Sequence, residues 1–168
     1  MDESLRSVTP GAAKLLLRSS GAGHAVAYSV SVTGKACQGF EPVGNVAHSG
    51  RGVVYPWIAR MNERTRSKLF QTQPYIEREV DPAHSVQVQA TGNWQQANTP
   101  ATLPVSMGRC GPLFASFLPT AGHVYSIDFA WRDGLGCALV VTDSTVPGAP
   151  VAEKFDAAQC PASDATKK

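Results

Sequence analysis

The feature that most constrains the fold is a two-residue alternation along Val124–Trp131. Tyr125, Ile127, Phe129 and Trp131 are large and apolar or aromatic, and smaller or polar residues stand between them. Successive side chains of a β-strand point to opposite faces, so this period is typical of a strand with one buried face. We therefore expect these four side chains to lie in the core.

The residues on either side of this strand predict an antiparallel meander. Leu113–Leu118 is an apolar run that Pro119 closes. Asp133 and Gly134 supply the chemistry of a hairpin turn, because Asp-Gly tolerates positive φ angles. Ala138–Val141 then forms the return strand.

Alternation elsewhere predicts further strands, and turn residues predict the connections between them. The charges of Tyr75–Val80 suit an edge strand. Gly34–Gly52 and Thr91–Pro104 are rich in turn residues and are predicted as loops. Pro56–Leu69 predicts one short amphipathic helix, at about 56–69. The further strands are Ala12–Arg18, Ala25–Thr33, Gly52–Tyr55, Tyr75–Val80 and Ser85–Ala90.

Together these patterns predict a mainly β fold, an antiparallel two-sheet sandwich of about seven to nine strands. The chain of 168 residues suits a single domain over residues 11–161, after a flexible lead-in at 1–10 and before a disordered tail at 162–168. A charged content of 17% argues against a disordered chain, and a net charge of +2 is too small to imply nucleic acid. No apolar run approaches the length of about 20 residues that a transmembrane helix needs.

One local motif resembles a known structural device. The linker Leu118–Tyr125 resembles the tyrosine corner of immunoglobulin-like sandwiches, in which a strand crosses between sheets and a tyrosine hydrogen-bonds back across the corner. The spacing of Gly122 and Tyr125 fits, although Thr120 stands where Asp is common; a plain hairpin with a buried tyrosine is the alternative. The pattern over Ser85–Val141 resembles small immunoglobulin-like domains of exported proteins and lipoproteins from Gram-negative bacteria. This resemblance is architectural and implies no functional residues.

The four cysteines are Cys37, Cys110, Cys137 and Cys160. Their wide separation excludes a CxxC redox pair and a zinc-knuckle spacing. An even number in a strand-rich chain indicates two disulfides and an oxidising compartment, with free buried thiols as the alternative. Cys110 and Cys137 begin strands at the same end of a sandwich, which favours Cys110–Cys137 with Cys37–Cys160. The rival pairing is Cys137–Cys160 with Cys37–Cys110.

The disulfide interpretation places the protein in the periplasm or outside the cell. Met1–Ser4 is polar and does not resemble a signal peptide. We therefore expect Met1 to replace a removed export signal. A lipid-modified cysteine upstream would be a natural anchor to the outer membrane.

No catalytic or metal-binding motif stands out. Ser49 lies between a histidine and a glycine without the strand-to-helix elbow of a hydrolase, and Arg51 lies between two glycines without the lysine of a P-loop. Glu77 and Glu79 flank Arg78 on the predicted edge strand, which indicates a solvated edge. By alternation Asp128 should face solvent. The four histidines, His24, His48, His84 and His123, are scattered and form no HExxH motif. His24 and His123 each lie beside a turn glycine and should be exposed, and His84 follows Asp81 and Pro82 in a turn.

One stretch concentrates charge and aromatic side chains, and we take it with Trp94 as the candidate interaction surface. Such a surface suits an acidic partner, a glycan or an anionic surface. The alternative is a solvated helix face with Trp57 in the core. Trp94, expected in a polar loop, could stack on a sugar ring or cap the sandwich. The surface comprises Arg51, Tyr55, Trp57, Arg60, Arg64, Arg66, Lys68 and Trp94.

These observations lead to three hypotheses. The first is a non-enzymatic, exported binding or structural module that contacts another protein of the cell envelope. The second is a small carbohydrate- or ligand-binding sandwich in which Trp57, Trp94 and Trp131 stack on the ligand. The third is an enzyme whose site is assembled from distant residues. None of the three requires a cofactor.

Overall fold

A computed structural model describes residues 7–47, 72–96, 106–146, 148, 151 and 153–155. These residues form ten strands and one short 3-10 turn, η2, at Asp133–Leu135. The strands are β1 Ala13–Ser20, β2 Ala25–Ser31, β3 Glu41–Val46, β4 Thr72–Gln73, β5 Tyr75–Val80, β6 Val86–Gln96, β7 Ser106–Phe117, β8 Val124–Trp131, β9 Cys137–Asp143 and β10 Glu153–Phe155.

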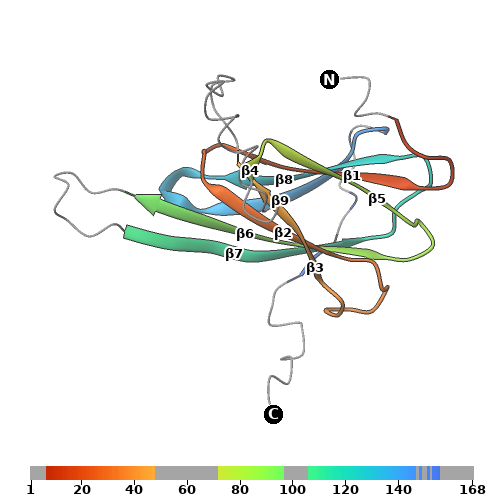
Figure 1. The fold of residues 1–168 in the computed structure, drawn as a ribbon, viewed down its shortest axis with the longest axis horizontal. Helices are drawn as coiled ribbons and strands as arrows, with labels where there is room; N and C mark the ends of the chain where they lie inside the picture. The colour runs from red at the N-terminus through yellow and green to blue at the C-terminus, as the bar shows by residue number, and fades with distance from the viewer. Residues whose placement is uncertain are drawn as a thin grey trace, which may run out of the picture.

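The strands lie in two sheets that pack face to face (Figure 1). One sheet has the order β5-β1-β8-β9, and the other has the order β10-β7-β6-β2-β3-β4. The prediction of a mainly β, two-sheet sandwich is confirmed. Two pairs, β1–β8 and β3–β4, are parallel, so the sheets are mostly rather than wholly antiparallel.

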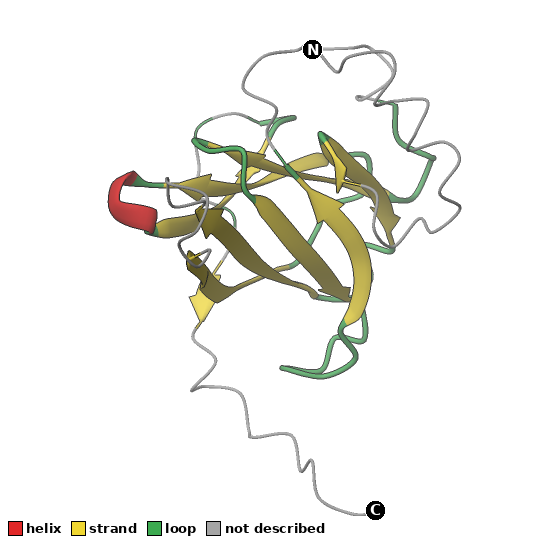
Figure 2. Ribbon diagram, turned by 60° about the vertical axis from the view of Figure 1, so that its left-hand side comes forward, coloured by secondary structure: helices red, strands yellow, loops and turns green. Residues whose placement is uncertain are grey.

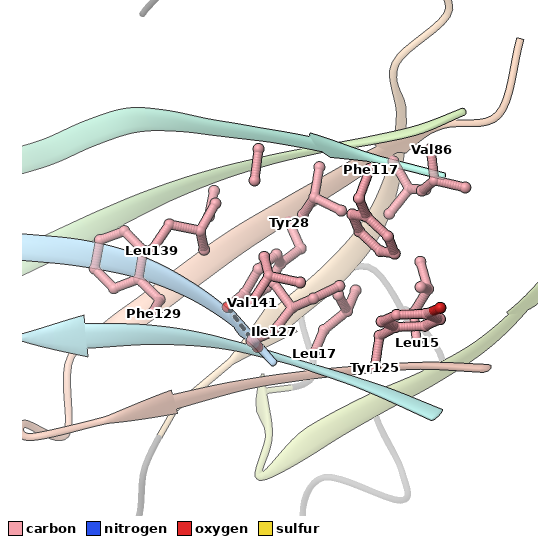
Figure 3. Packing of buried hydrophobic residues seen from close by; sticks show 14 of the residues in the cluster. Leu15, Leu17, Tyr28, Val86, Phe117, Tyr125, Ile127, Phe129, Leu139 and Val141 are labelled. Carbon is pink, nitrogen blue, oxygen red and sulfur yellow. Dashed lines mark hydrogen bonds between the residues drawn. The ribbon is translucent and has the colours of Figure 1, made fainter. Parts of the chain in front are cut away.

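The core lies between the sheets and contains the alternating residues of β8, as predicted. Phe129 and Ile127 are fully buried, and Tyr125 and Trp131 are nearly so. In Figure 3 the labelled side chains from both sheets meet in one layer. Such burial of apolar surface is the main favourable term in folding. Both sheets contribute side chains to this layer. They include Leu15, Leu17, Val26, Tyr28, Val30, Val86, Val88, Phe117, Leu139 and Val141.

Tyr28 brings a polar group into the middle of this core. Its hydroxyl hydrogen-bonds to the backbone oxygens of Arg18 at 2.6 Å and Ile127 at 3.3 Å, and the second bond is dashed in Figure 3. Burial raises the pKa of Tyr28 well above its usual range, and the negative charge of Asp128 raises it further. The hydroxyl therefore stays protonated, and its hydrogen bonds link β2 of one sheet to β1 and β8 of the other.

The predicted tyrosine corner is present. The linker after β7 crosses from the six-stranded sheet to β8 in the four-stranded sheet. The backbone N–H of Thr120 donates to the hydroxyl of Tyr125 at 2.8 Å. This bond fixes the crossing, because it holds the linker to Tyr125, the second residue of β8.

Strand pairing overrides local turn composition in two places where loops were predicted. β3 lies inside Gly34–Gly52, despite Pro42 and Gly44, and a bulge opposite Tyr28 and Ser29 accommodates it. β6 continues to Gln96, well into the predicted loop, because it pairs with β7 along this length. The predicted strand at 52–55, the predicted helix at 56–69, the lead-in and the tail fall wholly or largely outside the described residues.

Cys110 and Cys137 form the predicted disulfide, with a Cα–Cα distance of 6.1 Å. It joins β7 of one sheet to β9 of the other, and it excludes the rival pairing. Cys37 is also disulfide-bonded. Cys160 lies outside the described residues, so the Cys37–Cys160 pairing stays a prediction. Among the described residues no helix is long and apolar enough to cross a membrane.

Candidate binding cleft beside the β6–β7 arm

The hairpin of β6 and β7 reaches beyond the strands beside it (Figure 1). β2 begins at Ala25 opposite Asn93, and β10 pairs with β7 only at Phe114–Ser116. Residues 94–96 of β6 pair with residues 106–108 of β7, and no other described strand pairs with either segment. We call these six residues the arm.

Two adjoining hollows lie at the base of the arm and share His24 and Trp94. The arm hollow, of about 600 Å³, lies against β6 and β7, and the turn hollow, of about 480 Å³, reaches the β8–β9 turn, where η2 is red in Figure 2. Each hollow lies within the size range of small-ligand sites, and we call the two together the cleft. The arm hollow is lined by Gly23, His24, Ala25, Asn93, Trp94, Met107, Gly108 and Arg109. The turn hollow is lined by Gly21, Ala22, His24, Trp94, Trp131, Arg132, Asp133, Gly134 and Leu135.

Two glycines hold the indole rings at this end in place. Trp94 pairs across the strands with Gly108, and a Cβ added to Gly108 would lie 2.2 Å from Cζ2 of Trp94. A Cβ added to Gly92 would lie 2.4 Å from Cζ2 of Trp131. Each indole therefore packs directly on strand backbone, where any larger residue would displace it. The disulfide at Cys110, which pairs with Gly92, fixes the same stretch of β7 to β9.

Polar groups surround these rings. The ring of His24 meets Trp131 edge-on, with centroids 5.1 Å apart and planes at 72°. Arg132 and Asp133 are exposed on the β8–β9 turn, and Arg109 is exposed on β7. The cleft thus offers an aromatic surface, hydrogen-bond donors and one carboxylate acceptor.

The structure places the predicted site residues as follows. Trp94 lies on β6 rather than in a loop and is half-buried at the cleft, so its prediction as an exposed loop residue is wrong. Trp131 belongs mainly to the core and forms one wall of the turn hollow. The rest of the candidate interaction surface lies outside the described residues: Arg51, Tyr55, Trp57, Arg60, Arg64, Arg66 and Lys68.

Asp128 points away from the core as predicted, but it does not face open solvent. Its side chain is 18% exposed, and the hydroxyl of Ser20 donates to its Oδ2 at 2.6 Å. Arg18 lies 3.9 Å from Oδ1. β8 is an inner strand of its sheet, so neighbouring strands flank this outward-facing carboxylate on both sides. Alternation alone gives the direction of a side chain and not its exposure.

Two histidines expected to be exposed beside turn glycines have partners instead. His24 packs on Trp131, and Nδ1 of His123 lies 2.6 Å from Oδ2 of Asp143. Burial alone would raise the pKa of Asp143, but hydrogen bonds from His123 and from the backbone N–H groups of Thr145 and Val146 outweigh it, and the pKa is lowered. These bonds fasten the end of β9, at the opposite end of the sandwich from the cleft.

Glu77 and Glu79 lie on the edge strand β5, as predicted, and both are exposed. Glu77 pairs with the buried Lys14 at 3.5 Å. The backbone N–H of Thr9 donates to Glu79 and lowers the pKa of its carboxyl. In the described ranges, no group of three histidine, cysteine or acidic residues could hold a metal ion.

Sequence reasoning missed most of the cleft. His24, Arg109 and Asp133 come from three separate strands or turns, and only the strand register brings them together. The one nearby feature of the sequence that hints at a packed ring is Gly92, two residues before Trp94. The sequence matches no protein-family model and no curated protein sequence, so no residue role is carried over from another protein.

Proposed function

We propose that this chain is a non-enzymatic, exported binding module that contacts another protein of the cell envelope through the arm. The single observation that supports the proposal is the arm itself, two strands whose outer edges pair with no other described strand. Unpaired strand edges bind extended segments of other proteins by adding a strand, with backbone hydrogen bonds giving affinity. Met107, with 74% of its surface exposed on β7, would give such a partner an apolar contact.

The cell compartment is part of this proposal. The Cys110–Cys137 disulfide supports export to the periplasm or the cell exterior, because disulfides persist in oxidising compartments. The tyrosine corner supports a relationship to immunoglobulin-like sandwiches, and our proposal extends this relationship to the modules of Gram-negative exported proteins and lipoproteins. A lipid anchor upstream of residue 1 would place the arm close to other envelope proteins.

Site-directed cross-linking tests this function. A photoreactive residue at position 95, which pairs with Met107 in the arm, should trap one discrete envelope protein, and amide hydrogen exchange at the arm should slow once that purified protein is added. Met107→Lys should abolish capture, since a lysine on an edge opposes strand addition. Leu118→Lys is the matched control, because Leu118 is 65% exposed and lies just beyond the other end of β7. Equal capture by both variants would refute contact through the arm.

A carbohydrate-binding function is the second candidate. The observation that favours it is the cleft, in which Trp94 lies beside polar groups. It shares Trp94, Met107 and Gly108 of the arm with the first function, so the two functions need separate tests.

A further inference from the structure

We infer that the cleft is a saccharide-binding site, with the indole of Trp94 as its stacking surface and the β8–β9 turn as its source of hydrogen bonds. The inference does not rest on contact through the arm. It depends on three features of the cleft, namely a fixed aromatic ring, polar groups of both kinds, and a buried donor without a partner.

The fixed ring comes first. Gly108 carries no side chain, so the junction of the two indole rings of Trp94 lies over the backbone of β7, and Cε2 and Nε1 would also lie within 2.6 Å of a Cβ there. One face of the indole is therefore covered by its own hairpin. Trp94 is half-buried and lines both hollows. A ring held in this way loses little side-chain entropy when a ligand stacks on it.

The polar groups select the class of ligand. Sugar hydroxyls both donate and accept hydrogen bonds. In the turn hollow the Asp133 carboxylate can accept them, and the side-chain nitrogens of Arg132 and His24 lie beside the indole as their counterparts. A phosphate ligand would be attracted by Arg109 and Arg132 but repelled by the Asp133 carboxylate, whereas saccharide hydroxyls can bond to all three groups. A flat aromatic ligand would use two facing rings, but His24 and Trp131 meet edge-on and not as parallel walls.

The buried donor supports a polar ligand. Trp131 lines the turn hollow and is 6% exposed, and its indole N–H has no hydrogen-bond partner in the described part of the chain. A buried N–H without a partner is costly, and proteins seldom retain one. A polar ligand in the turn hollow would bring an acceptor to the wall that Trp131 forms.

The test uses the full chain with its disulfides intact and a panel of oligosaccharides of glucose, N-acetylglucosamine and glucuronate. Binding is followed by NMR of the indole N–H signals and by calorimetry. We expect at least one panel member to shift the Trp94 signal. Trp94→Ala should then weaken its affinity by about tenfold or more, and Trp94→Phe should weaken it less. Asp133→Ala, on an exposed turn, should weaken binding without affecting folding.

Tyr75→Ala is the matched control, because Tyr75 is an aromatic residue with 41% exposure on β5, away from the cleft. It should bind the saccharide as the unmodified protein does. The inference is overturned if no panel member shifts the Trp94 signal, or if affinity survives both Trp94→Ala and Asp133→Ala. The outcome is separate from that of the arm, because saccharide binding is measured on the purified chain alone, without the envelope protein that the cross-linking test requires.

Discussion

Replacing Gly92 by alanine should destabilise the protein, although alanine normally stabilises a strand relative to glycine. The added Cβ would lie 2.4 Å and 2.5 Å from Cζ2 and Cη2 of Trp131, and 2.8 Å from Cε1 of Phe129. Real Cβ contacts are not this short, so the rings or the strand must move. Phe129 is fully buried in the packed core, and Trp131 is 6% exposed and borders open space only on the side of the turn hollow.

The size of the effect follows from overpacking. An extra methyl in a packed core costs about 1–3 kcal/mol, and loss of the backbone freedom of glycine returns only about 0.5–1 kcal/mol. We therefore expect the free energy of unfolding to fall by about 1–2 kcal/mol, which lowers Tm by about 2–8 °C in a chain of this size. Urea unfolding followed by tryptophan fluorescence measures it.

Gly136→Ala provides the control for this prediction. Gly136 lies in the β8–β9 turn with a φ of −73°, and a Cβ there would have no neighbour nearer than 3.7 Å. Its substitution should leave stability unchanged or raise it slightly. If Gly92→Ala matched Gly136→Ala in stability, the packing of the two rings on Gly92 would be wrong.

Three further predictions concern other parts of the fold. Replacing Cys110 and Cys137 together by alanine should lower the free energy of unfolding by about 3–4 kcal/mol, since the disulfide spans 27 residues; an unchanged urea midpoint would contradict this. Tyr125→Phe should cost about 1 kcal/mol in urea unfolding, since the Thr120 N–H loses its acceptor, and an equally stable variant would show that the corner bond contributes nothing. Asp143→Asn should remove stability at neutral pH, and the difference from the unmodified protein should vanish as acid protonates the carboxylate. The pKa of Asp143 is lowered in the folded state, so its contribution is complete above the ordinary aspartate pKa of about 4 and is lost as pH falls through the folded value; a difference that persisted at low pH would refute the assignment.

The sequence predicts those parts of this fold that depend on one strand at a time. The alternation along Val124–Trp131 identifies β8 and its buried face, because burial follows the strand period. The tyrosine corner is predictable because its two partners, Thr120 and Tyr125, are five residues apart. The Cys110–Cys137 pairing is predicted correctly because both cysteines lie at the same end of the sandwich, although Cys110 is the fifth residue of β7 and does not begin it.

What the sequence does not predict depends on pairing between strands. β6 continues past Thr91 through polar residues because β7 supplies its hydrogen bonds. No pattern within residues 91–96 indicates this pairing. The partial burial of Asp128 requires knowing that β8 is an inner strand. The cleft combines His24, Trp94 and Asp133, which are far apart in sequence and meet only through this register.

The two ends of the sandwich differ in a way that bears on function. At the end with the tyrosine corner, polar groups bond to one another, as the Asp143 carboxylate accepts bonds from His123, Thr145 and Val146. Such groups have little capacity left for a ligand. At the arm end the indole of Trp94 rests on backbone beside open space, and a disulfide holds the strands beneath it. A ligand or partner at that end can bind a surface that is already ordered, at little cost in conformational entropy. Both proposals therefore belong to this end, and a variant such as Gly108→Ala, which displaces the indole without removing it, should weaken saccharide binding and spare contact through the arm edge.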